Sequence, residues 1–228
     1  MILRMRRLVL LLVIVTALAA PAAASAAERT VSVHATVERK VPNDAAEVRF
    51  AVSKERPGRA AALRVVAQRV RAVIAAAQAI PGVEPGDVTT GTISVRRVKR
   101  GERPVYRASE GVTVVTHQPE EAGNLVAAGV AAGATSTRGP KFFVGDREAA
   151  YDAALVEALQ RAKAKAEMLA AAVGATLGPA IAIVESGTVT SFTGPQASEP
   201  ADKGASAPPV KPGRSTVEAT VDATFALQ

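Results

Sequence analysis

The stretch RAKAKAEMLAAAVGATLG, residues 161–178, decides the fold because its spacing of small, charged and apolar residues suits few structures. It completes a periodic segment, residues 146–173, in which Asp146 is a predicted N-cap and Gly174 a predicted C-terminal cap. The apolar positions recur every three or four residues, which predicts one helix face: Tyr151, Leu155, Ala158, Ala162, Ala166, Leu169 and Val173.

The alanine-lined face excludes two other interpretations of this helix. A membrane-surface helix has bulky apolar residues on one side. A coiled coil repeats Leu or Ile through several heptads. This face contains mainly methyl groups, which allow a helix to lie close against a sheet. We therefore predict a helix that packs in the core of a folded domain.

The first 27 residues have the pattern of a secretory signal peptide. Three arginines precede an apolar run over residues 8–20, and Ala24-Ser25-Ala26 fits the small-x-small cleavage pattern. The run is shorter than the roughly 20 residues that span a bilayer. An uncleaved N-terminal anchor is the alternative. We expect an exported protein that is periplasmic, or extracellular and associated with the cell envelope, and a mature chain without a transmembrane segment.

Composition limits the function classes that the mature chain, residues 28–228, can belong to. Three of the 28 lysines and arginines lie in the predicted signal, so 25 remain against 21 acidic residues. Aromatic residues make up 3% of the chain, too few for the stacking surfaces that bind single-stranded nucleic acid. Cysteine is absent, which excludes thiol chemistry and thiolate metal sites. We expect no nucleic-acid partner.

The remaining elements follow from periodicity. Residues 30–41 alternate apolar and polar, and Pro42-Asn43-Asp44 supplies a turn before a second strand at residues 48–53, so a hairpin is predicted. Residues 215–227 alternate most regularly and are expected to pair with an earlier strand. Further strands are predicted at 88–97, 105–116, 136–144 and 179–189, and further helices at 57–80 and 119–132.

These elements predict an α+β fold with an antiparallel-rich mixed sheet and helices packed on one face, in the order β-β-α-β-β-α-β-α-β-β. Residues 28–228 are expected to form a single domain. Within it, residues 191–214 are rich in Pro, Gly and Ser and are predicted to be a flexible loop.

No residue cluster indicates a catalytic, cofactor or metal site. His34 shares a strand face with Ser32 and Glu38, but same-face neighbours lie roughly 7 Å apart, too far for a nucleophile and its base. His117, at the start of the shorter helix, is a candidate for sensing pH or for hydrogen bonding in a turn. The carboxylates Asp146, Glu148 and Asp152 are explained by a helix N-terminus.

A basic stretch is the one candidate binding site. Its residues, predicted to lie near a hairpin tip, are Arg96, Arg97, Lys99, Arg100 and Arg103. They suit an anionic component of the envelope, such as a polymer or phospholipid headgroups. The alternative is a solvated turn that prevents the edge of a sheet from aggregating.

Several segments resemble the SIMPL domain family of exported bacterial proteins, which includes the periplasmic immunogenic proteins. They are VPNDAAEVRFAV, GVEPGDVTTGTISV, the segment from GATSTRGPKFFVGD through the long helix to GATLG, and PPVKPGRSTVEATVDATFAL. The resemblance implies an α+β domain that tends to self-assemble into a homo-oligomer, and it implies no reaction. We therefore expect a non-enzymatic envelope protein that acts by self-assembly or partner binding. The alternatives are a hydrolase-like enzyme with a site built from distant residues, and a module that binds envelope polymers.

Overall fold

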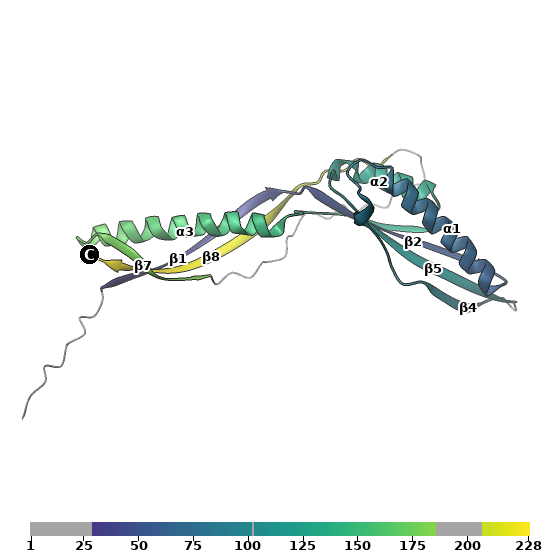
Figure 1. Cartoon of the computed structure of the whole chain (residues 1–228), viewed down its shortest axis with the longest axis horizontal. Helices are drawn as coiled ribbons and strands as arrows, with labels where there is room; N and C mark the ends of the chain where they lie inside the picture. The colour runs from purple at the N-terminus through teal and green to yellow at the C-terminus, as the bar shows by residue number, and fades with distance from the viewer. Residues whose placement is uncertain (1–28, 102, 186–206) are drawn as a thin grey trace, which may run out of the picture.

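The computed structural model describes residues 29–101, 103–185 and 207–228, so the predicted signal peptide and most of the predicted loop at 191–214 lie outside the described residues. The chain forms two lobes placed end to end (Figure 1). Within the described residues, three α-helices accompany two sheets in which every strand pair is antiparallel. The predicted α+β class is confirmed, with two antiparallel sheets in place of one mixed sheet.

The terminal lobe is built from the two ends of the described chain. Its sheet has the order β1-β8-β7, with β1 at Thr30–Pro42, β8 at Arg214–Leu227 and β7 at Leu177–Glu185. The register pairs β1 with β8 over the whole length of β1, so the predicted pairing of the last strand with an earlier one is confirmed. Helix α3, Arg147–Ala172, lies along β1 and β8 (Figure 1).

Helix α3 packs through an almost unbroken row of alanines. Asp146 caps it, since its Oδ1 accepts a hydrogen bond from the Ala149 amide at 2.9 Å. The buried positions are Tyr151, Ala154, Ala158, Ala162, Ala166 and Ala170. The predicted burial of Leu169 and Val173 is wrong, because these side chains are 39% and 64% exposed. Steps of four residues advance the face by about 40° each, so the row winds around the helix above the twisted strands.

The predicted hairpin of the first two strands is wrong. Strand β2, Ala45–Arg56, pairs with β5 and β6 in the other sheet, and residues 42–44 connect the lobes. Asn43 is buried there. Its Nδ2 donates to the Pro212 carbonyl, and its Oδ1 accepts from the Ser215 hydroxyl, both at 2.6 Å. The turn residues therefore bind the entry to β8 and do not close a hairpin.

The central lobe contains a sheet of the order β3-β5-β2-β6, with β4 paired to β5. The strands are β3 Val88–Thr90, β4 Ser94–Arg100, β5 Arg103–Thr116 and β6 Ser136–Phe143. The single strand predicted at 88–97 is divided at residues 91–93, where the register on β5 shifts by one residue between the pairs Thr90–Val112 and Ser94–Ser109.

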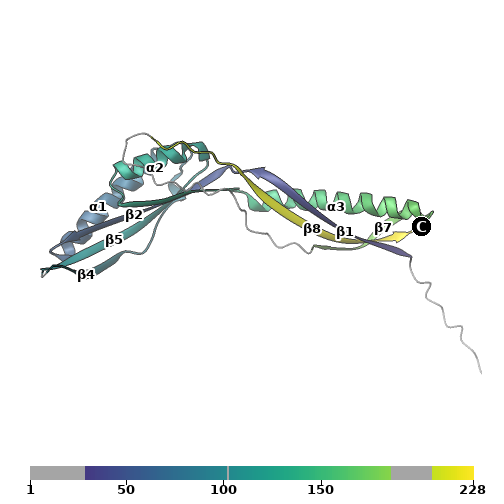
Figure 2. The same ribbon diagram turned by 180° about the vertical axis from the view of Figure 1, so that it is seen from behind.

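Helices α1, Arg59–Gln78, and α2, Ala122–Ala131, cover one face of the central sheet (Figure 2). The predicted stripe on α1 is confirmed for its buried members, Ala62, Val66, Val70, Val73 and Ala77, and Ile80 is partly buried. Among the described helices, none is both long and apolar enough to cross a bilayer.

Two glycines in α2 allow close approach of neighbouring groups. A Cβ at Gly129 would lie 2.3 Å from Cε1 of the Phe50 ring, and one at Gly123 would lie 2.3 Å from the Pro208 carbonyl oxygen. Glycine lowers helix propensity. Here the loss of propensity is offset by packing of α2 on β2 and on the segment that leads into β8.

We predict that Gly129→Ala destabilises the protein, because the new methyl group forces the buried Phe50 ring from its place. Overpacking lowers the free energy of unfolding by roughly 1–3 kcal/mol. The higher helix propensity of alanine offsets up to about 1 kcal/mol of this loss. The measurement is the free energy of unfolding in urea. Gly86→Ala is the control, since nothing lies within 4 Å of a Cβ there. Equal stability of the two variants would contradict the packing.

Candidate functional site

The predicted basic residues lie at the free end of the central lobe, on the β4–β5 hairpin. The register pairs Arg100 with Arg103 across a connection in which Gly101 has a φ of 60°. The strands thus extend further than predicted and shorten the turn. All five predicted cations are exposed. This end of the molecule lies opposite the C-terminus (Figure 1).

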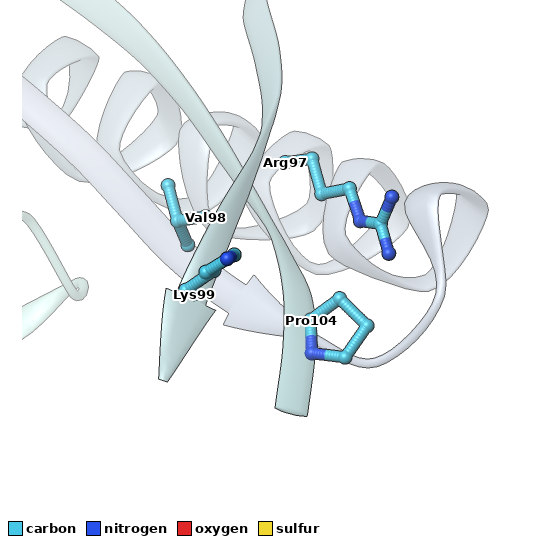
Figure 3. A pocket seen from close by; sticks show the side chains of 4 residues that line it. All are labelled: Arg97, Val98, Lys99 and Pro104. Atoms are coloured by element: carbon cyan, nitrogen blue, oxygen red, sulfur yellow. The ribbon is translucent and has the colours of Figure 1, made fainter. Parts of the chain in front are cut away.

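Alternation along β4 divides the predicted cluster between the two faces of the hairpin. Arg97 and Lys99 share the face of Val95, which packs against the core beneath α1. The opposite face carries Arg96 and Arg100. It also carries Arg103, which is paired with Arg100. Figure 3 shows Arg97 and Val98 directed to opposite sides of β4, beside a hollow lined also by Lys99 and Pro104. The five cations therefore surround the hairpin and do not form one patch.

One of the five predicted cations is already engaged by a carboxylate. Glu55, at the end of β2, accepts hydrogen bonds from Arg100 Nε at 2.8 Å and from Arg107 Nη2 at 2.5 Å. The hydrogen bond from Arg100, followed by that from Arg107, holds the pKa of Glu55 below its usual range. This ion-pair group ties β4 and β5 to β2 and orients the hairpin.

The sequence reasoning missed Glu55 and Arg107 as members of this site. Arg107 lies in the strand predicted at 105–116, and Glu55 lies just beyond the strand predicted at 48–53. Their partnership depends on the pairing of β2 with β5, where Glu55 is directly opposite Arg107. The wrong prediction of a β1–β2 hairpin placed β2 beside another strand, so nothing in the pattern brought the two residues together.

His34 is part of a hydrogen-bonded chain on the open face of the terminal sheet. Its Nδ1 lies 2.9 Å from Asp222 Oδ1 on β8, and its Nε2 lies 3.3 Å from Thr36 Oγ1. Ser32 contacts Thr224 instead. The sequence argument overlooked Asp222, because it considered neighbours on a single strand.

These hydrogen bonds connect an acid, a histidine and a hydroxyl in the order of a catalytic triad, but the three side chains lack the enclosed site of a triad. The side chains of His34 and Asp222 are 59% and 50% exposed. A catalytic triad acts in a site that shields a buried acid and aims donors at the developing oxyanion. We interpret the chain as cross-strand pairing that stabilises the sheet.

His117 supports a turn, as the sequence suggested. Its backbone amide donates to the Gly82 carbonyl at 2.8 Å, and its Nε2 lies 3.2 Å from Asp87 Oδ1. Asp87 also accepts from the Glu84 amide. In the part of the chain that the structure describes, no three metal-ligating side chains converge.

Strand β7 is a second exposed feature and was not anticipated as a candidate site. It is an edge strand, and its apolar side chains Ile181, Ile183 and Val184 are 49%, 53% and 57% exposed. Its end is fixed to α3, because the Tyr151 hydroxyl donates to Glu185 Oε1 at 2.5 Å. This bond, together with burial of the ring, raises the pKa of Tyr151 to about 12.

The fold defines a two-lobed α+β protein with a basic hairpin at one end and an apolar edge strand in the other lobe. The family model described as "SIMPL: Protein of unknown function (DUF541)" matches residues 31–225. The chain therefore belongs to the SIMPL family, as the resemblance suggested. The family is described as one of unknown function, so membership assigns no biochemical role to the chain. No curated protein matches the chain.

We predict that Glu55 stabilises the protein above about pH 4.3, the ordinary glutamate pKa, and that this contribution disappears as pH falls through its lower folded-state value. The measurement is the difference in urea midpoint between wild type and Glu55→Gln. This difference should be constant near neutral pH and should decrease in acid. A difference that grows on acidification would contradict the ion-pair assignment.

Proposed function

We propose that the protein is exported, has no enzymatic activity and acts in the cell envelope by self-assembly, with copies joined through β7. The edge of β7 carries this proposal. Helix α3 packs mainly on β1 and β8 and leaves the apolar side chains of β7 exposed. An edge strand of this kind is a template for pairing with another chain.

The composition of β7 favours a second copy of the same chain as the partner. The strand LGPAIAIVE contains one charged residue, Glu185, at its end. Two such strands paired antiparallel about a two-fold axis would place each Glu185 opposite the apolar start of the other strand. No like charges would meet, and the isoleucines would lie near the centre of the paired strands. Both copies would use the same surface, which makes the interface isologous.

Export is supported by the predicted signal peptide at residues 1–27, since the family match begins just after it, at residue 31. The mass of the protein recovered from the periplasm or medium would show whether this segment is removed.

The absence of enzymatic activity is supported by the exposure of the Asp222–His34–Thr36 chain, the most triad-like arrangement in the described residues. An esterase activity of the purified protein that disappears in His34→Ala would contradict this part of the proposal.

We predict that Val184→Lys makes the protein monomeric, because a lysine on the edge strand disfavours strand pairing. The control is Val156→Lys on the outer face of α3, where the native valine is 56% exposed, close to the 57% of Val184. Light scattering coupled to size exclusion should find wild type and the control larger than a monomer.

Three results would overturn assembly through β7: a monomeric wild-type protein at high concentration, equal dissociation of both variants, or an unchanged oligomer in Val184→Lys.

A further inference from the structure

The positive charge at the free end of the central lobe extends beyond the hairpin. We call the described residues of 54–64 and 94–107 the basic pole. Its cations are Lys54, Arg56, Arg59, Arg64, Arg96, Arg97, Lys99, Arg100, Arg103 and Arg107. Glu55 is the only acid among the described residues of the pole. Helix α1 contributes because it begins directly after β2, and it contains no acidic residue over its length.

The cations of the pole differ in their availability. Glu55 engages Arg100 and Arg107, and so fixes the hairpin on β2. Among the described residues, no hydrogen bond or ion pair engages the side chains of Arg96, Arg97, Lys99 or Arg103, and all four residues are exposed. The hairpin, which is fixed on β2, thus exposes at least four cations whose side chains have no partner among the described residues.

The shape of the basic pole favours an anionic surface over a linear polyanion as its ligand. The hairpin end projects from the lobe in both views (Figures 1 and 2). The cations lie on both faces of the hairpin. Proteins that bind a single-stranded polyanion track it along a charged groove with stacked aromatic rings. A projecting end with charge on several sides instead meets a planar array of anions, whichever side faces it.

Guanidinium groups and small apolar side chains suit phospholipid headgroups in particular. Arginine forms bidentate hydrogen bonds with phosphate. Pro104, Val98 and Tyr106 lie between the cations and are exposed or half-buried. Tyrosine is favoured at the boundary between headgroups and water.

We propose that the basic pole is a binding site for the anionic phospholipid surface of a membrane, through contacts of Arg96, Arg97, Lys99 and Arg103 with phosphodiester headgroups. The site holds the protein peripherally, with the terminal lobe directed away from the bilayer. This inference goes beyond the proposed assembly and does not depend on it, although assembly would increase the avidity by placing several poles on one surface.

Cosedimentation of the mature chain with lipid vesicles tests the proposal. We expect binding to phosphatidylcholine vesicles that contain about one third phosphatidylglycerol, and none to pure phosphatidylcholine. Binding should weaken steeply when ionic strength rises from about 0.01 M to 0.15 M, since the screening length falls from about 30 Å to about 8 Å.

The test variant replaces Arg96, Arg97, Lys99 and Arg103 with Gln. Each cation near an anionic membrane contributes about a fivefold factor in binding. At least two of the four face the surface at once, so the variant should bind at least about 25-fold more weakly. The control replaces four exposed cations near the lobe junction and has the same net charge: Arg39, Lys40, Lys211 and Arg214 to Gln. It should retain binding.

Three outcomes would overturn the proposal: no preference for the anionic vesicles, an equal loss in the control variant, or binding to polyphosphate without binding to vesicles. Repeating the measurement with Val184→Lys separates this site from assembly. Reduced but salt-sensitive vesicle binding by a monomeric variant would support the pole, whereas abolished binding would show that the pole has no affinity of its own and overturn it.

Discussion

The close packing of the α3 alanines on β1 and β8 is the contact on which the terminal lobe depends. Ala158, Ala162 and Ala166 meet Val33, Val221 and their neighbours in one buried cluster. Because alanine has no side chain beyond Cβ, the helix lies close to the sheet along most of its length. This contact covers the paired first and last strands of the described chain, and Tyr151 extends it to the end of β7 through Glu185.

The narrow helix determines what the terminal lobe exposes. A single α3 covers β1 and β8 well and β7 poorly, so the apolar residues of β7 remain at an open edge. At the other end of the molecule, Glu55 orients a hairpin whose remaining cations have no partner among the described residues. The two exposed features lie in different lobes (Figure 1), so one copy can present an edge to a neighbour and a basic pole to a membrane.

Local periodicity predicted most of the helices and strands, but it did not predict which strands pair. The burial of Ala62, Val66 and Val70 on α1 and the cap at Asp146 follow from spacing of a few residues. The separation of β1 from β2 depends on Asn43, whose partners lie near residue 213 and have no local signal. Likewise, the sequence placed the five cations on one hairpin, but their division between faces and the role of Glu55 depend on strand register. Asp222 escaped notice beside His34 for the same reason.

Equilibrium unfolding of Ala162→Leu beside Ala164→Leu tests the alanine contact most directly, because the two positions lie two residues apart on α3 and, of the two, only Ala162 is buried. A leucine at 162 has no space between helix and sheet, and should lower the free energy of unfolding by about 1–3 kcal/mol. A leucine at the exposed position 164 should change it by less than about 0.5 kcal/mol. Equal stability of the two variants would contradict the account, since α3 would then not lie close against β1 and β8.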